Sequence, residues 1–171
     1  MFTGMETGQS APPRREDAEA HLLAYFRDWS FRPAHPDERF DLDRAFRHYA
    51  PHFHVRDVPP NLEALRKGRW QRDYYGEHGA SGYRRPMEVL YGRSRHVEMK
   101  PYLDTLRVQP EGLDGMRTLV DFDSRVVFKG PVSLPFTLPL RANVLWRRLE
   151  GAAWKIEDEL LSLRRPRLFG R

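Results

Sequence analysis

Apolar residues recur at helical intervals in two stretches near the start of the chain. The first predicts a helix over about residues 15–30, with acidic residues in its first turn, where they suit the positive end of the helix dipole. The second follows Asp41, whose side chain can accept a hydrogen bond from a free amide of the next turn. Pro51 cannot continue a helix, so we expect the second helix to end before it. The apolar stripes are Ala18, Leu22, Tyr25, Phe26 and Trp29, then Leu42, Ala45, Phe46 and Tyr49.

After Pro51 the spacing changes to alternation, which is typical of a strand with two different faces. We expect one face to be apolar and to end in a carboxylate, and the other to be polar. The two helices therefore deliver a short strand that ends on Asp57. The apolar face carries Phe53, Val55 and Asp57, and the polar face carries His52, His54 and Arg56.

Residues 62–97 are the least regular part of the chain. We expect a short helix from Leu62 to Gly68 and another helix that begins at Pro86. Between them, three aromatic residues share a segment with three glycines. Such a segment is either an ordinary surface loop or a flap over a pocket. These residues are Trp70, Tyr74 and Tyr75 with Gly76, Gly79 and Gly82.

Four extended segments fill the rest of the chain, separated by short turn signals. Turns this short imply antiparallel neighbours, and long strands form a twisted sheet that needs helices on one face. The sequence therefore predicts an α+β fold. The segments span about residues 98–109, 116–129, 137–149 and 152–163. We expect a flexible leader at residues 1–13, a single domain at residues 14–163 and a basic tail at residues 164–171.

Composition narrows the function classes. The chain has no cysteine, which excludes disulfides, thiolate metal sites and cysteine nucleophiles. Its net charge of +5 would suit nucleic acid, but acidic residues are interleaved with the basic ones almost everywhere, so we do not expect nucleic-acid binding. No apolar run approaches the ~20 residues that cross a bilayer, and the start does not resemble a signal peptide. We therefore expect a cytoplasmic protein without membrane contact.

Asp57 is the strongest candidate for chemistry, because it ends an apolar strand face. Burial there would raise its pKa and make it a base near neutral pH, whereas in solvent it would only cap the turn at residues 58–60. Asp158 falls on the apolar face of the last strand by simple alternation, so it is either a second acid or half of an ion pair. Its candidate partners are Arg125, Arg141 and Arg147.

Histidines and aromatic residues add two further hypotheses. His48, His52 and His54 are close in sequence, but no carboxylate is in place as a third ligand, so we interpret them as solvated or interface residues and expect no metal site. Four aromatic residues either line a pocket for a flat apolar ligand or belong to the core. They are Tyr102, Phe122, Trp146 and Trp154.

Two segments resemble the nuclear-transport-factor-2-like superfamily, and within it the ketosteroid isomerase and SnoaL-like group. Residues 49–60, YAPHFHVRDVPP, are similar to the Y-A-x-x-a-x-x-x-D-P segment of that group, in which "a" is hydrophobic. Residues 142–156, ANVLWRRLEGAAWKI, are similar to its penultimate strand, turn and final strand. The resemblance implies a cone-shaped, curved antiparallel or mixed sheet that packs against N-terminal helices and surrounds an apolar pocket.

The resemblance also implies roles for individual residues. Asp57 would be the general base, and Tyr25 in the first helix would hold a developing oxyanion together with Asn143. An acid stands at the position of Asn143 in the isomerases, so Asn143 either donates to the oxyanion as an amide or lies in solvent or at an interface. We expect the ligand to be small and hydrophobic, with no cofactor, and the protein to be a homodimer. The expected substrate contacts are Phe53, Val55, Tyr102, Phe122, Trp146 and Asp158.

The resemblance suggests two alternative functions. In the first, the cone binds a small hydrophobic molecule and acts on it as a general-base isomerase, cyclase or dehydratase. In the second, the same fold is a non-catalytic scaffold or subunit that acts through dimerisation or partner binding. A deep cavity ending at Asp57 would favour the first function, and a closed core would favour the second.

Overall fold

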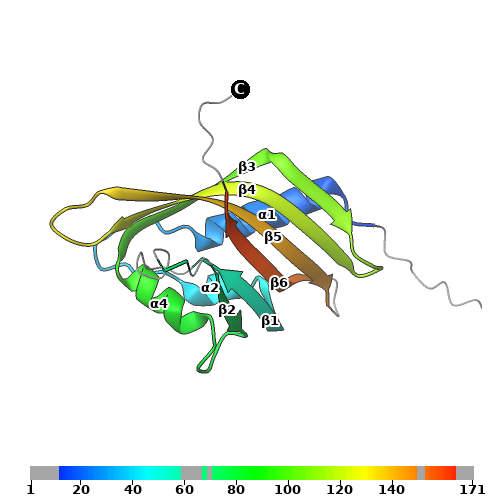
Figure 1. Ribbon diagram of the computed structural model, residues 1–171, viewed down its shortest axis with the longest axis horizontal. Helices are drawn as coiled ribbons and strands as arrows, with labels where there is room; N and C mark the ends of the chain where they lie inside the picture. The colour runs from blue at the N-terminus through cyan, green and yellow to red at the C-terminus, as the bar shows by residue number, and fades with distance from the viewer. Residues whose placement is uncertain (1–11, 59–66, 69–70, 150–152, 165–171) are drawn as a thin grey trace, which may run out of the picture.

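In the described part of the chain, three helices join one sheet of six strands (Figure 1). The computed structural model describes residues 12–58, 67–68, 71–149 and 153–164. Its elements in chain order are α1 (Arg15–Trp29), α2 (Leu42–Phe46), β1 (Tyr49–Asp57), β2 (Arg72–Tyr75), α4 (Arg84–Gly92), β3 (Ser94–Pro110), β4 (Gly115–Phe128), β5 (Pro135–Arg148) and β6 (Trp154–Leu163).

The sheet is mixed, with the strand order β2-β1-β6-β5-β4-β3. Neighbouring strands are antiparallel except β1 and β6, which run parallel. In Figure 1 the long strands β3 to β6 form a curved surface along which α1 lies, while α2, α4, β1 and β2 gather at one end. The predicted α+β class and the curved mixed sheet are confirmed.

The helix and strand patterns of the sequence predict most element bounds to within a few residues. The strand expected after Pro51 starts earlier, at Tyr49. It can contain Pro51 because its pairing with β6 is interrupted between Tyr49 and His54. Pro51 lies inside that interruption, where its missing N–H leaves no ladder hydrogen bond unmade. Asp41 caps α2 as expected, since its Oδ1 accepts a hydrogen bond from the Arg44 amide at 3.0 Å.

The glycine-rich segment forms an edge strand and a turn. Tyr74 of β2 is buried in the core, and Tyr75 stacks on the ring of His54 with centroids 4.6 Å apart. Neither tyrosine lines the apolar cavity that is described in the next section. The helix predicted from Leu62, and Trp70, lie outside the described residues.

Alternation along the long strands gives the sheet an inner and an outer face. Phe122 on the inner face of β4 meets Phe26 of α1, with ring centroids 4.9 Å apart. On the outer face, Arg141 donates a hydrogen bond to Asp121 at 2.7 Å. Each fully buried large apolar side chain contributes ~1.5–3 kcal/mol, so the inner face supplies most of the stabilisation. None of the helices in the described part of the chain is long and apolar enough to span a bilayer.

Candidate functional site

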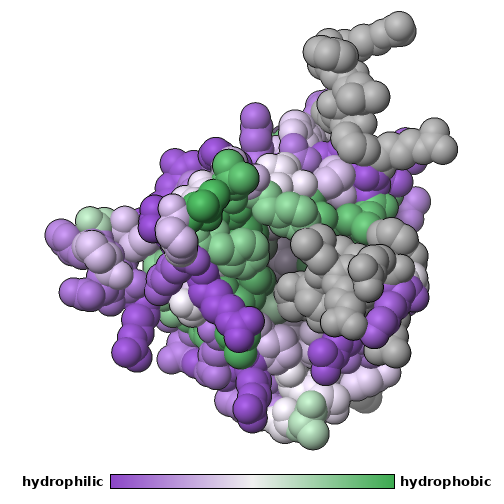
Figure 2. All heavy atoms as spheres, turned by 60° about the vertical axis from the view of Figure 1, so that its left-hand side comes forward, coloured by the Kyte–Doolittle hydropathy of each residue, from purple (hydrophilic) through white to green (hydrophobic). Residues whose placement is uncertain are grey.

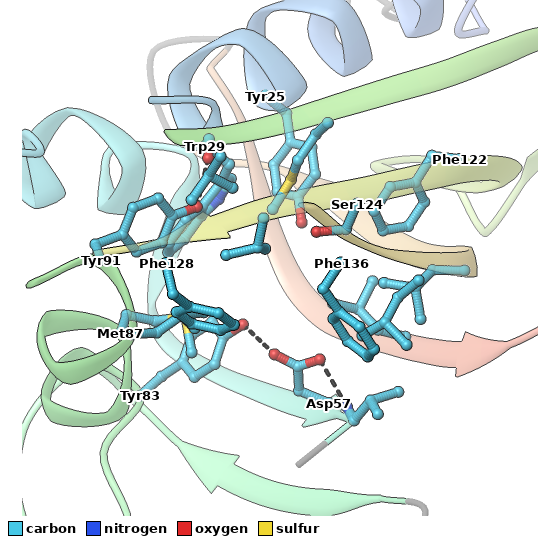
Figure 3. A pocket seen from close by; sticks show the side chains of 18 residues that line it. Tyr25, Trp29, Asp57, Tyr83, Met87, Tyr91, Phe122, Ser124, Phe128 and Phe136 are labelled. Atoms are coloured by element: carbon cyan, nitrogen blue, oxygen red, sulfur yellow. Dashed lines mark hydrogen bonds between the residues drawn. The ribbon is translucent and has the colours of Figure 1, made fainter. Parts of the chain in front are cut away.

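An apolar cavity of about 340 Å³ lies between α1, α4 and the inner face of the sheet. Figure 2 shows hydrophobic side chains gathered around a hollow on one side of the molecule. Phe128 and Phe136 line the cavity and are each 39 % exposed, so they belong to its open side. Most of the wall is aromatic or aliphatic, and the few polar groups on it include the Ser124 hydroxyl (Figure 3).

Asp57 is the one acidic side chain among the described residues that line this cavity. Its Oδ2 accepts a hydrogen bond from the Tyr83 hydroxyl at 2.6 Å, and its Oδ1 accepts one from the Val58 amide at 2.6 Å (Figure 3). Burial raises the pKa of Asp57 to about 6, although both hydrogen bonds favour the ionised form and oppose that rise. Asp57 is therefore a carboxylate that can accept a proton near neutral pH.

The turn after β2 brings Tyr83 to Asp57. Residues 76–82 double back, and the Tyr83 amide donates to the Gly76 carbonyl at 3.0 Å. Gly82 is so tightly packed that a Cβ there would lie 2.5 Å from the carbonyl oxygen of His78. Only glycine fits at this point without moving the backbone. The glycine-rich segment thus positions Tyr83, whose hydroxyl donates a hydrogen bond to Asp57.

A second carboxylate, Glu159, is completely buried behind the cavity wall. The Tyr25 hydroxyl donates to its Oε1, and the Tyr49 hydroxyl donates to its Oε2 at 2.7 Å. Burial raises the pKa of Glu159 to about 7 against the effect of these hydrogen bonds, and the charges of Asp57 and Asp158 raise it further. Because Tyr25 also lines the cavity, it connects the buried acid to the space where a ligand would lie.

A β-bulge in β6 places Glu159 inside. Ile156 and Asp158 pair with consecutive residues of β5, so Glu157 is an extra residue in β6. Alternation reverses at the bulge: Ile156 and Glu159 are fully buried, while Asp158 is turned to the outer face. Simple alternation across the strand therefore selects the wrong acid.

Three residues singled out from the sequence line the cavity, namely Tyr25, Asp57 and Phe122. Phe53 and Val55 are buried in the core and are not among the lining residues. The alternation that placed them on the same face as Asp57 is nevertheless observed in the burial of β1.

Two predicted aromatic contacts lie away from the cavity. Trp146 is completely buried in the core, where its Nε1 donates to the Thr118 hydroxyl at 3.0 Å. The Tyr102 hydroxyl donates to Oδ2 of Asp123 at 2.6 Å. Asp123 lies on the outer face of β4. Trp146 is thus core, and Tyr102 belongs to a polar cluster.

Asn143 and Asp158 lie on the outer face of the sheet, which corrects their assignment to the site. Asn143 Oδ1 accepts a hydrogen bond from Arg117 at 3.0 Å. The position leaves no route for Asn143 to hold an oxyanion in the cavity. Asp158 accepts a hydrogen bond from Arg56 at 3.1 Å and contacts His54 Nδ1 at 3.3 Å. The ion pair expected of Asp158 therefore exists, but its partner is Arg56.

The three histidines do not converge on one point. His48 Nε2 lies 2.8 Å from Asp28 Oδ2, and His54 Nε2 lies 2.8 Å from Asp73 Oδ1. His52 is exposed. Among the described residues, no group of three or more histidine or acidic side chains is arranged to hold a metal ion.

No family model and no curated protein matches the chain, but solved structures do. A candidate aromatic ring hydroxylase from Novosphingobium aromaticivorans is similar with a TM-score of 0.65 and 16 % identity, over 89 % of this chain and 90 % of its own. A candidate dehydratase of the NTF2-like family from Streptomyces avermitilis has a TM-score of 0.62 and 12 % identity, over 87 % of this chain and 95 % of its own.

A third solved structure, a candidate scytalone dehydratase from Novosphingobium aromaticivorans, has a TM-score of 0.60 and 10 % identity. The match covers 86 % of this chain and 82 % of that protein. All three identities are low, so the likeness concerns the arrangement of helices and strands. The chain has the fold of the nuclear-transport-factor-2-like superfamily, as the resemblance of residues 49–60 and 142–156 implied.

Proposed function

We propose that the protein binds a small hydrophobic molecule in the apolar cavity and catalyses proton transfer at it, with Asp57 as the general base. One observation carries this proposal. A carboxylate whose pKa is raised to about 6 stands in the wall of an otherwise largely apolar cavity. Such a group is ionised at neutral pH and basic enough to take a proton from carbon next to a carbonyl.

Tyr25 and Glu159 supply the complementary acid. Burial raises the pKa of both acids, and the charges of Asp57 and Asp158 raise that of Glu159 further, so in this proposal Glu159 keeps a proton while Asp57 is ionised. A protonated Glu159 donates to Tyr25, which frees the Tyr25 O–H to donate into the cavity. Figure 3 shows the hydroxyls of Tyr25 and Ser124 on the other side of the cavity from the Asp57 carboxylate.

Dehydration of a hydrophobic β-hydroxy carbonyl compound uses both groups. Asp57 removes a proton from the α-carbon, which lies between the carbonyl and the carbinol carbon. The electron pair of that C–H bond forms the new C=C double bond. The hydroxyl leaves as water with the proton of Tyr25, which Tyr25 recovers from Glu159. Two of the similar structures are candidate dehydratases, which supports this reaction class over isomerisation. The outer-face position of Asn143 points the same way.

The cavity beside Asp57 favours ligand chemistry over the scaffold function, for which a closed core was the expectation. Homodimerisation through the outer face of the sheet stays a prediction. That face carries ion pairs such as Arg141–Asp121, so a dimer formed there would depend on ionic strength.

The proposal is tested with a panel of hydrophobic β-hydroxy ketones and cyclic ketones, followed by NMR for loss of water or exchange of the α-proton in D₂O. We expect Asp57→Asn to lower the rate by at least about 100-fold while the melting temperature stays within a few degrees of wild type. Asp73→Asn is the matched control, because Asp73 is exposed and, among the described residues, its side chain bonds only His54. Equal rates in wild type and Asp57→Asn would refute the mechanism.

A further inference from the structure

A second hollow, which we call the basic cleft, opens where the end of α1, α2 and the start of β6 meet. Its volume is about 360 Å³, and it shares no lining residue with the apolar cavity. Its charged side chains come from three separate elements, so the fold assembles them. The lining residues are Arg27, Asp28, Arg44, Arg47, His48, Trp154 and Lys155.

Cations outnumber anions in the basic cleft by four side chains to one. Asp28, the only acid on its wall among the described residues, is 6 % exposed. Arg27 Nε lies 3.2 Å and Arg44 Nε 3.3 Å from Asp28 Oδ1, while His48 holds Oδ2 at 2.8 Å. Both guanidinium groups meet Asp28 through Nε, so their Nη groups remain available as donors. Elsewhere in the described chain, Arg27 and Arg44 form no second ion pair.

The remaining two cations, Arg47 and Lys155, have no acidic partner in the part of the chain that the structure describes. Within the described residues, Arg47 makes no ion pair, and the Lys155 ammonium donates only to the Arg47 carbonyl. The excess of positive charge affects the pKa of the His48 imidazole. Burial lowers the pKa of His48, Asp28 opposes that, and the nearby charges of Lys155 and Arg27 lower it further.

We propose that the basic cleft binds the phosphate group of a small molecule. Three arginines and a lysine around one hollow match a dianion, because guanidinium forks fit pairs of phosphate oxygens and the ammonium adds a point charge. Asp28 neutralises one of the four charges, so the site carries a net charge of +3 (4 − 1), most of which a phosphate dianion offsets. The cleft is larger than one phosphate needs, which leaves space beside Trp154 for an organic group.

The test is calorimetric titration of the wild-type protein with inorganic phosphate, pyrophosphate and phenyl phosphate, at constant ionic strength set with chloride. We expect saturable binding at one site, and at least a tenfold loss of affinity in the double variant Arg27→Gln/Arg47→Gln. Arg39→Gln/Arg107→Gln is the control, since it removes the same charge from exposed positions outside the basic cleft. Tighter binding of phenyl phosphate assigns the site to a phosphate ester, and equal binding assigns it to free phosphate.

The His48 ring gives a second, local readout. A bound dianion favours the imidazolium form, so the NMR-measured pKa of His48 rises in the presence of the phosphate probe. The groups that face His48 are Asp28, Arg27, Lys155 and His21, together with the Tyr25 ring at 5.9 Å between centroids. Absence of saturable binding by all three probes overturns the proposal. Equal weakening in both double variants, with no change at His48, also overturns it, because the effect would then be net charge alone.

Discussion

At the scale of single residues, the surroundings of Asp57 and Glu159 raise the pKa values of two carboxyl groups to which the proposed function gives the roles of base and acid. Both are desolvated, and desolvation raises both pKa values. Each carboxylate accepts two hydrogen bonds that favour its ionised form, so Asp57 keeps the lower pKa because it starts from 3.8 and not 4.5 and because neighbouring acids raise only the pKa of Glu159. Glu159 lies deeper and also feels the negative charge of Asp57. Each ionisation therefore depends on the other.

The hydrogen bond from Tyr83 makes a residue-level prediction. Tyr83→Phe removes a donor that favours ionised Asp57, so the pKa of Asp57 should rise above about 6, by about one pH unit for a charge-assisted bond of ~1.5 kcal/mol. A titration of the Asp carboxyl carbons by ¹³C NMR measures it. Tyr102→Phe is matched as a control, because its hydroxyl also donates to an aspartate Oδ2 at 2.6 Å, but away from the cavity. An unchanged Asp57 titration in Tyr83→Phe would exclude this role of the hydrogen bond.

At the scale of elements, two local irregularities create the candidate site. The bulge at Glu157 turns Glu159 inward in a strand that otherwise alternates, and the turn at residues 76–82 delivers Tyr83 to Asp57. Both features break a regular pattern, and bulges are often found beside functional sites for that reason. A regular β6 would have presented Asp158 to the core in place of Glu159.

The turn gives a prediction with an internal control. At Gly82 an added Cβ would lie within 2.6 Å of three backbone atoms, so Gly82→Ala must move the turn and should cost about 1–3 kcal/mol of unfolding free energy. Gly92 ends α4 with nothing within 4 Å of the added Cβ, so Gly92→Ala should be neutral or stabilise slightly. Urea denaturation compares the two variants. Equal stability in both would show that the turn is not tightly constrained.

At the scale of the whole molecule, sequence patterns predicted the fold and placed Asp57 at the end of an apolar face, but they did not reveal Tyr83 or Glu159. Periodicity and turn signals locate α1 and the long strands because each is a local property. Asp57 was singled out because it ends a regular apolar face and because residues 49–60 resemble a family segment that ends in an aspartate. Tyr83 and Glu159 could not, since one depends on how a turn closes and the other on a bulge that only pairing with β5 reveals.

The inner side of the sheet was a further question that local pattern left open. β5 has apolar residues on both faces, for example Val144 inside and Leu145 outside, both buried. The side covered by α1 decides the assignment, and that is a tertiary property. Asn143 consequently belongs to the outer face, although the resemblance of residues 142–156 aligns it with a catalytic position.

The buried acids also predict how the stability of the whole protein responds to pH. A folded-state pKa of about 7, raised from 4.5, means that folded Glu159 holds a proton that the unfolded chain has already released. Its stabilising contribution is complete below about pH 4.5 and is lost as pH rises through 7. Asp57, raised from 3.8 to about 6, acts in the same direction at lower pH. Asp28 and His48 have lowered pKa values, so their contributions to the stability of the folded protein are lost as pH falls.

Between pH 6 and pH 8.5 Glu159 should therefore make the melting temperature fall as pH rises, whereas His21, His48 and His96, whose pKa values are lowered from 6.5, act in the opposite direction. Glu159→Gln stays neutral throughout, and its amide can accept from one tyrosine and donate to the other, so it removes only the falling contribution, and the difference in slope between this variant and wild type measures Glu159. Glu157→Gln controls for loss of a carboxylate on the same strand, because Glu157 is exposed on the outer side and should keep the wild-type slope. Differential scanning calorimetry in matched buffers measures all three slopes. If Glu159→Gln and Glu157→Gln gave the same slope as wild type, Glu159 would have to be ionised in the folded protein already at pH 6, and the proton it is proposed to supply through Tyr25 would not exist.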